Sequence, residues 1–462
     1  MGLNGHSTRT PLLTLSFISN YKRVAPHWPT FFTPSGAFFA SRFSSLTAVS
    51  SPPLPRLSTP GVSNWLLLSS ALVFGIVVVG GVTRLTESGL SITEWRPIAG
   101  TLPPLTQEEW EVEFEKYKAT PEFKILNHRI TLSEFKRIFY MEYTHRLLGR
   151  IIGLTFVVPL TYFVLRKRLS AGHPSRLFGL SLLLGFQGFL GWYMVKSGLS
   201  SALLDMPNAH PRVSQYRLAA HLGAALALFV GMFGTGLEIR RDWRWVNQGV
   251  WSGVRAVGES VVWEGVLGRA GVRRFKGAAM VLTGLVFLTA LSGAFVAGLD
   301  AGLVYNEFPL MGGRLAPPST ELFSAHYAKS ADGSDLWWRN LLENPTTVQF
   351  DHRLLAMTTY VSTTALYLTT RLRSLRGALP PLTHHMAKAA LAMVNLQVAL
   401  GISTLLYLVP IPLAAAHQAG SVVLLSAMVA LVGSLRRPSA AARVWREAKR
   451  AVELNAKRGK AA

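Results

Sequence analysis

The sequence predicts an all-α polytopic membrane protein whose eight transmembrane helices form two pseudo-symmetric four-helix bundles. The first observation is composition, because 49% of the 462 residues are hydrophobic and only 15% are charged. The second is that several apolar runs reach about 20 residues, enough for a helix to cross a hydrocarbon core about 30 Å thick. The third is an internal repeat that relates the two halves of the chain.

Eight apolar runs define the expected spans. The last two are joined by a tight turn at Pro410 and Pro412, because neither proline can continue a helix. The expected spans cover residues 64–84, 144–166, 177–196, 216–238, 277–299, 352–370, 386–408 and 413–435.

The repeat divides these spans into two groups of four in the same orientation. Residues 80–90 align with residues 293–303 at an offset of 213. Later pairs in the same order are His145 with His352, Gln187 with Gln397, and His221 with His417. We therefore expect an N-terminal four-helix bundle over 64–238 and a C-terminal four-helix bundle over 277–436, related by an axis along the membrane normal.

Charge predicts the orientation of the helices. The net charge is +23, and Lys and Arg concentrate in the loops 166–176, 238–276 and 371–388 and in the tail 437–462. Positive loops stay on the side from which insertion occurs, so both termini are expected in the mitochondrial matrix. The predicted topology accounts for the positive net charge, so the charge does not indicate a nucleic-acid partner.

The absence of cysteine excludes disulfides and thiolate metal sites.

Three segments lie outside the predicted bundles. Residues 1–63 are basic, rich in Ser and Thr and free of Asp and Glu, which is typical of a mitochondrial transit peptide; a plain N-terminal tail is the alternative. Residues 239–276 form an expected matrix linker whose Trp and Arg residues suggest an interfacial amphipathic stretch, or else a linker without a role. Residues 437–462 form a basic matrix tail.

Four histidines give the strongest functional signal. His145, His221, His352 and His417 each lie at or just inside the start of spans 2, 4, 6 and 8. All four therefore share one membrane face, toward the intermembrane space. An ionisable side chain within a membrane span usually marks a functional site.

Two imidazoles from facing helices can ligate one metal axially, and in membrane bundles that metal is usually heme iron. The residues one turn deeper are all small, which would leave room for a porphyrin, although small residues are also common at membrane helix contacts. They are Gly149, Ala225, Ala356 and Ser421. Zinc is the weaker candidate, because it normally needs three or four protein ligands.

The two sites differ in one charged group. Glu142 lies three residues before His145, whereas Gln349 holds the equivalent place before His352. A carboxylate in only one half suggests that this half performs chemistry and the other holds a permanent cofactor. The alternative is that Glu142 is a residue at a helix start that the helix dipole favours.

Several further residues are secondary candidates. Arg217 lies four residues before His221 and is a candidate contact for a heme propionate. Arg146 and Arg353 are better explained by interfacial snorkelling. Four acidic residues of the outer loops could cap the site or carry protons: Glu87, Glu94, Asp300 and Glu307. The histidines of loops and span ends are expected to be solvated: His128, His210, His326, His384 and His385.

At these residues the sequence resembles the heme A synthase family, from about residue 64 to residue 436. The segments that carry the resemblance are 83–90, 140–146, 185–195, 212–221, 297–306, 349–353 and 416–420. The resemblance implies oxidation of the C8 methyl of heme O to the formyl of heme A, by two successive hydroxylations and loss of water. Many bacterial members have a cysteine pair in an outer loop, which this chain lacks.

The resemblance also assigns roles. It implies that His145 and His221 hold the substrate heme O, that His352 and His417 hold a resident heme b, and that Glu142 is catalytic. The implied partners are ferredoxin and ferredoxin reductase as electron donors, with heme O synthase and cytochrome oxidase assembly factors. The implied location is the mitochondrial inner membrane, and we expect a homo-oligomer surrounded by membrane lipid.

Two axial histidines leave the substrate iron without an open position for oxygen. We therefore expect either that one histidine of the substrate pair lets go during turnover, or that Glu142 manages protons while oxidation takes another route. The rival functions are a non-catalytic diheme b-type electron carrier and a heme chaperone or exporter. A transmembrane carrier would favour hemes staggered across the bilayer, whereas both predicted sites lie toward one face.

Overall fold

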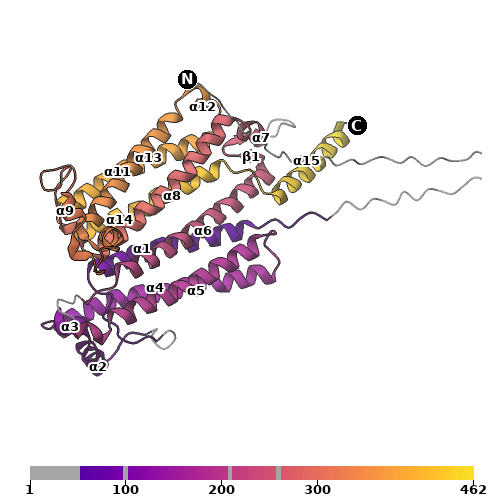
Figure 1. Cartoon of the computed structure of the whole chain (residues 1–462). Coiled ribbons are helices and arrows are strands. Elements are labelled where there is room, and N and C mark those ends of the chain that lie inside the picture. Colours follow the sequence, from indigo (N-terminus) through magenta and orange to yellow (C-terminus); the bar gives the residue numbers. More distant parts are fainter. Residues whose placement is uncertain (1–52, 97–101, 206–210, 256–261, 462) are drawn as a thin grey trace, which may run out of the picture. The chain divides into compact units, whose positions relative to one another are not determined.

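A computed structural model describes residues 53–96, 102–205, 211–255 and 262–461 of the chain. Most of the predicted transit peptide, through residue 52, lies outside these ranges, as does His210. Within these ranges eight helices have 24 or more residues, and each overlaps one predicted span (Figure 1). They are α1 (Pro60–Leu85), α4 (Leu132–Leu165), α5 (His173–Gly198), α6 (Gln215–Gln248), α8 (Ala270–Gly298), α11 (Pro345–Thr369), α13 (Pro381–Leu406) and α14 (Ile411–Ser434).

Within the described ranges, seven of these helices are long and apolar enough to cross a membrane. The prediction of an all-α polytopic membrane protein is confirmed to that extent. The exception is α11, which has the length but carries Asp351, His352 and Arg353 together with several threonines. The eighth crossing therefore stays a prediction.

Short elements fill the connections. Between the histidine-bearing ends of the long helices lie α2 (Gln107–Lys118), α3 (Pro121–Ile125), η2 (Ser201–Asp205), η3 (Ala301–Leu303), α9 (Ser319–Leu322), η4 (Ala325–Tyr327) and α10 (Leu336–Glu343). The other connections and the tail contain β1 (Val250–Trp251), β2 (Val254–Arg255), α7 (Val262–Leu267), α12 (Arg373–Arg376) and α15 (Ala440–Ala461). The two strands pair as an antiparallel hairpin, a small departure from the all-α prediction.

The long helices pack in two rings. In the first, α1 contacts α4 and α6, and α5 contacts the same two helices. In the second, α8 contacts α11 and α14, and α13 contacts the same two. The rings meet where α6 packs on α8 and α14, and where α1 packs on α14. This is the contact pattern expected of a duplicated four-helix unit, although the pseudo-symmetry itself stays a prediction.

One helix start and two helix ends show how the sequence sets these elements. Thr131 begins α4 with a capping box, in which its side chain accepts from the backbone of Glu134 and the Glu134 carboxylate accepts from the backbone of Thr131. Glu87 and Asp300, which are equivalent in the repeat, follow α1 and α8 in the left-handed region at φ 49° and 53°. The chain therefore turns out of both helices in the same way.

In the described part of the predicted matrix linker, an interfacial place is wrong for three tryptophans, while the location and role of the linker stay predictions. Trp245, Trp251 and Trp263 are buried in a small core that includes Ala442 of α15. The Trp251 indole also donates to the carbonyl of Arg436 at 2.9 Å. The three rings are covered because α6 extends to Gln248 and α15 packs against it, although the indole nitrogens of Trp245 and Trp263 have no hydrogen-bond partner in the described chain. The basic tail is thus a helix docked on α6.

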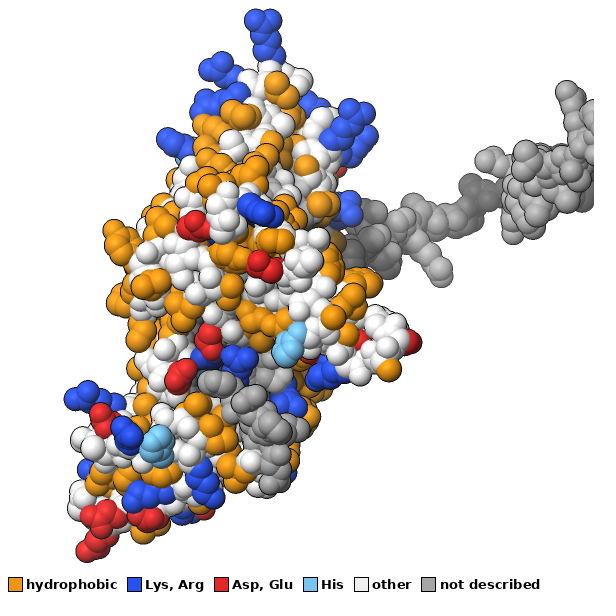
Figure 2. All heavy atoms as spheres, turned by 60° about the vertical axis from the view of Figure 1, so that its left-hand side comes forward, with side chains coloured by type: hydrophobic (Ala, Val, Ile, Leu, Met, Phe, Trp, Pro, Cys, Tyr) orange, Lys and Arg blue, Asp and Glu red, His pale blue; other side chains and the backbone are white. Residues whose placement is uncertain are grey.

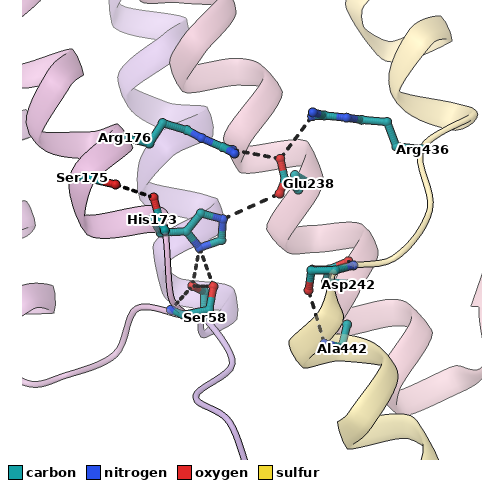
Figure 3. Close-up of polar contacts among 11 residues, drawn as sticks. Ser58, His173, Ser175, Arg176, Glu238, Asp242, Arg436 and Ala442 are labelled. Carbon is teal, nitrogen blue, oxygen red and sulfur yellow. Dashed lines mark hydrogen bonds and ion pairs between the residues drawn. The ribbon is translucent and has the colours of Figure 1, made fainter. Parts of the chain in front are cut away.

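A polar cluster joins the chain at the end opposite the histidine pairs (Figure 3). Glu238 of α6 accepts from Arg176 of α5 at 2.9 Å and from Arg436, after α14, at 3.2 Å. Its other oxygen lies 3.8 Å from Nε2 of His173, whose Nδ1 contacts the Ser58 hydroxyl at 2.8 Å. One carboxylate therefore connects segments from both halves of the sequence.

We expect Glu238→Gln to lower the free energy of unfolding by about 1–2 kcal/mol, because it leaves two arginines unpaired beside each other. The measurement is the apparent melting temperature of the purified protein in detergent. Glu447→Gln is the matched control, since Glu447 is exposed on α15. Equal melting temperatures for the two variants would show that the cluster does not stabilise the fold.

Candidate functional site

The structure brings the four predicted histidines together in the two predicted pairs. The rings of His145 and His221 lie 6.5 Å apart between centroids with an interplanar angle of 69°. The rings of His352 and His417 lie 6.4 Å apart at 87°. Each pair comes from diagonal helices of its ring, α4 with α6 and α11 with α14, so the imidazoles meet across the middle of the ring.

The spacing within each pair fits a metal held between two imidazoles. A metal–imidazole bond of about 2 Å and a ring radius of about 1 Å on each side give centroids about 6 Å apart. An edge-to-face contact without metal can have the same separation. Nδ1 of His221 is buried with no hydrogen-bond partner in the described chain, which is costly for a polar atom.

The donor set favours heme over zinc. Within the described residues no group of three or more His, Asp or Glu side chains could hold a metal ion. Two histidines per site satisfy the axial positions of a heme, whose porphyrin supplies the other four ligands. The residues present therefore fit heme, and His145, His221, His352 and His417 are the ligands that would hold it.

Each imidazole lies against a glycine that the sequence analysis did not single out. A Cβ built on Gly80 would lie 3.0 Å from Nε2 of His145, and one on Gly401 would lie 2.8 Å from Cε1 of His417. The corresponding contacts of His352 with Gly293 and of His221 with Gly191 are 3.4 and 3.5 Å. Gly80 aligns with Gly293 in the repeat, and Gly191 aligns with Gly401. The repeat could therefore have indicated these glycines from the sequence.

The ring of His352 has a fixed protonation pattern. The Ser292 hydroxyl lies 2.7 Å from Nδ1 of His352 and donates its own hydrogen to the carbonyl of Thr289 at 2.8 Å. Because that hydrogen is already used, the hydroxyl must accept from Nδ1–H. Nε2 of His352 is then unprotonated and free to bind a metal, the usual arrangement of a histidine ligand.

The first site lacks this anchor. The repeat offset of 213 places Val79 where the second half has Ser292. The ring nitrogens of His145 make no hydrogen bond to another residue of the described chain. The second site has a further contact, because the amide nitrogen of Gln397 lies 3.2 Å from Nδ1 of His417. The second pair is thus held by polar neighbours and the first pair is not.

Gln187 and Gln397 have the same backbone role in both halves. Each side-chain amide donates to the carbonyl of the histidine facing it, from Gln187 to His221 at 2.9 Å and from Gln397 to His417 at 2.8 Å. A side chain from α5 or α13 therefore fixes the helix turn that carries a ligand. The alignment paired these glutamines, but it did not indicate this role.

Glu142 points to the outer loop, and its interpretation as a helix-start residue was wrong. It lies ten residues inside α4 and is 3% exposed. Its carboxylate accepts from the Ser91 hydroxyl at 2.8 Å, the backbone of Ile92 at 2.9 Å and the Arg146 guanidinium at 2.6 Å. Glu142 therefore fixes the loop that follows α1 above the first histidine pair.

Gln349 makes the equivalent contact with reversed polarity. Its amide donates to the carbonyl of Tyr305 at 3.0 Å, and Tyr305 is the repeat equivalent of Ile92. A carboxylate can only accept, so the first half binds a loop N–H where the second half binds a loop carbonyl. The Glu142/Gln349 difference thus changes the loop contact as well as the charge.

Arg146 and Arg353 hold outer loops, a role that the sequence interpretation did not include. Arg146 donates to the carbonyls of Ile92 and Glu94 at 2.9 and 3.0 Å. Arg353 donates to the carbonyl of Glu307, the equivalent of Glu94, at 2.9 Å. Each guanidinium holds an outer loop because the loop carbonyls lie within its reach.

The other candidates take varied places. Arg217 donates to the Ser197 hydroxyl at 2.6 Å and lies over the ring of Tyr193 at 4.7 Å, so its propionate role stays a prediction. Asp300 pairs with Arg84 and Arg212 at 2.8 and 3.2 Å, which connects the outer loops of the two halves. His128, His326 and His385 are exposed and His384 is partly buried, which fits the solvated interpretation of these loop histidines.

Glu122 is a buried carboxyl near the first site that the sequence analysis missed. It lies in α3, is 4% exposed, and its Oε2 has no partner in the described chain. Burial raises the pKa of Glu122 from 4.5 to about 8, and the negative charges of Glu142 and Glu87 act in the same direction. This carboxyl is therefore largely protonated at neutral pH.

Helices that can cross a membrane, together with two facing histidine pairs, define a heme-binding integral membrane protein as the class. The sequence also matches the model of the COX15-CtaA family, described as a cytochrome oxidase assembly protein, over residues 63–429. The chain therefore belongs to this family, as the resemblance had indicated.

Curated relatives agree with this assignment. The heme A synthase COX15 of Saccharomyces cerevisiae is 46% identical over 91% of this chain and 84% of its own length. The heme A synthase COX15 of Homo sapiens is 48% identical over 81% of this chain and 83% of its own. A heme A synthase–mitochondrial ferredoxin fusion protein of Schizosaccharomyces pombe is 47% identical over 86% of this chain and 64% of that protein.

Glu122 predicts a pH dependence of stability. Its pKa is raised in the folded state, so the folded protein binds more protons than the unfolded chain between about pH 4.5 and 8. The free energy of unfolding should fall by about 2–4 kcal/mol as the pH rises through this window. Glu122→Gln should remove this part of the decline, whereas exposed Glu108→Gln should keep it. Melting curves in detergent at several pH values measure the difference, and parallel pH profiles would contradict the assignment.

Proposed function

We propose that the chain converts heme O to heme A, with His145 and His221 holding the substrate heme and His352 and His417 holding a resident heme b. The observation that carries the proposal is that two histidine pairs share one spacing but differ in their supporting contacts. The family assignment and the names of the relatives support the overall reaction.

The supporting contacts favour this assignment of the two hemes. A bound heme b supplies one-electron chemistry. A permanent ligand benefits from a fixed ring, and Ser292 fixes His352 while Gln397 contacts His417. A substrate must enter and leave, and Nδ1 of His221 has no hydrogen-bond partner in the described chain, while Val79 stands where a hydroxyl would face His145. The freer pair is also the one in which a histidine could let go during turnover.

Glu142 would serve the reaction in two ways. It keeps the outer loop closed over the first pair through Ser91 and Ile92, and closure excludes water. Its carboxylate could also take up or release protons at this end of the site. The mainly protonated carboxyl of Glu122 lies close enough for the charge of Glu142 to influence its pKa, so it is a second proton store.

Charge distribution and the relatives support the location and the electron donor. In Figure 2, Lys and Arg side chains crowd the upper end, Asp and Glu lie mostly in the lower half, and hydrophobic side chains cover much of the surface between. This agrees with a mitochondrial inner-membrane protein whose histidine pairs lie toward the intermembrane space. A relative fused to a mitochondrial ferredoxin supports ferredoxin as the donor. The homo-oligomer stays a prediction.

The function is tested by supplying purified protein with heme O, reductant and oxygen and identifying the extracted hemes. We expect the alcohol and formyl derivatives of heme O. Recovery of heme b alone, with heme O unchanged, would favour a diheme electron carrier or a heme chaperone instead.

We expect Glu142→Gln to retain heme but to lose formyl formation by about 100-fold, because the amide cannot handle protons as a carboxylate does. The measurement is the ratio of heme A and its alcohol precursor to heme O after a fixed reaction time. Ser91→Ala is the matched control, since it removes one loop contact and leaves the carboxylate. Equal losses in both variants would assign Glu142 to loop placement alone.

The difference between Ser292 and Val79 provides a reciprocal test. Ser292→Val removes the acceptor for Nδ1–H of His352, which makes the imidazole a weaker donor. Heme retention at the second site should fall about tenfold or more, and the reduction potential of that heme should rise. Val79→Ser should hold His145 more firmly and slow turnover. Thr283→Val is the control, because that hydroxyl bonds only to the Ala279 carbonyl. An unchanged potential in Ser292→Val would contradict the anchoring role.

A further inference from the structure

A basic cavity lies at the end of the second ring opposite its histidine pair. It measures about 380 Å³ and lies between the end of α11, the short helix α12 and the start of α13. Its lining includes Arg371, Arg376 and Lys388 with His384, His385 and Tyr367, and no Asp or Glu. Three cationic side chains from three elements therefore face one space without a counter-charge in the lining.

One basic side chain of the cavity is held in place and two are unpaired, an arrangement that favours binding of an anion. The Arg371 guanidinium contacts the Tyr367 hydroxyl and lies over that ring at 5.1 Å, which keeps its position defined. Arg376 and Lys388 have no side-chain hydrogen bond or ion pair to another residue of the described chain. They can thus turn their charge toward a ligand.

Both cavity histidines are oriented by backbone carbonyls. Nε2 of His384 lies 3.1 Å from the carbonyl of Arg376, and Nδ1 of His385 lies 2.7 Å from that of Pro381. A carbonyl can only accept, so each ring carries its proton on the nitrogen facing the carbonyl. Nδ1 of His384 and Nε2 of His385 are left without such a bond, and each would donate to an anion only from a protonated imidazole.

At the same end of the first ring, a basic residue is paired with a carboxylate. There Arg176 pairs with Glu238, and Glu238 also pairs with Arg436 (Figure 3). Glu238 thus compensates Arg176 at the start of α5, whereas the lining of the cavity at the start of α13 contains no carboxylate. The two helices are repeat equivalents, so this difference separates the two rings.

The surroundings of the cavity indicate where its ligand comes from. Leu368 at the end of α11 and Leu372 just after it are 57% and 55% exposed, so apolar surface adjoins the cations. Because the cavity lies at the start of α13, a helix that can cross a membrane, we expect it to be level with lipid headgroups. Basic pockets between membrane helices at this depth bind phosphate-bearing headgroups such as that of cardiolipin.

We propose that this cavity binds the phosphate headgroup of an anionic phospholipid, with its acyl chains along Leu368 and Leu372. Arg371 and Arg376 supply the forked donors that match phosphate oxygens, and Lys388 adds a point charge. In the proposed orientation the site faces the matrix leaflet. It requires no heme chemistry, so its test is independent of the proposed function.

The test measures cardiolipin binding to the delipidated full-length protein in detergent by native mass spectrometry, with phosphatidylcholine and inorganic phosphate as parallel ligands. We expect preferential binding of cardiolipin that weakens with added salt. Each lost basic residue should weaken binding about fivefold, so Arg376→Gln/Lys388→Gln should lose about 25-fold. The single variants, expected to lose about fivefold each, serve if the double variant does not fold.

Arg373→Gln/Arg274→Gln is the charge-matched control, because both arginines are exposed and neither lines the cavity. This control should retain cardiolipin binding. A loss equal to that of the cavity variant would overturn the proposal in favour of general surface attraction. Binding of inorganic phosphate as tight as that of cardiolipin would overturn the lipid assignment, and equal binding of phosphatidylcholine would overturn the role of charge.

Discussion

Four imidazoles facing one another in pairs inside rings of apolar helices are the constraint on which the rest of this structure depends. A polar ring there needs partners for both nitrogens, and the buried Nδ1 of His221 has none in the described chain. The helices can approach this closely because glycines, such as Gly80 and Gly401, face the rings. The fold thus sets two imidazoles at a separation that iron can bridge, and the unsatisfied polarity gives iron a reason to bind.

Duplication produces the two sites, and small departures from it separate their roles. The glutamines that hold the ligand-bearing carbonyls and the glycines beneath the rings occur in both halves. Ser292 occurs in only one half, because Val79 takes its place in the other. The Ser292 hydroxyl therefore holds the ring of His352, and the first half has no counterpart to it. The two pairs thus differ in the groups behind the histidines, although the histidines themselves are arranged alike.

Sequence patterns predicted the long helices and both histidine pairs, because hydrophobic length and internal repetition are visible in one dimension. They failed where tertiary contacts decide. The tryptophans of residues 239–276 looked interfacial, but a helical tail covers them, and no local pattern revealed that docking. The loop contacts of Arg146 and Arg353 were missed because the nearness of the outer-loop carbonyls depends on the loop path. Glu122 was missed since burial of a loop carboxyl leaves no periodic signal.

The contacts of Glu142 with the outer loop add a structural role to the difference between Glu142 and Gln349. On sequence alone the carboxylate is a chemical group beside a ligand, yet in the fold it accepts three hydrogen bonds and helps to hold a loop in place. These roles are compatible, because a carboxylate that closes the loop also places a charge at the edge of the site. The same carboxylate is the acceptor for Ile92 and Arg146, so replacing it changes the loop contact and the charge at once. At Gln349 the amide donates to a loop carbonyl instead, so the two halves hold equivalent loops with opposite polarity.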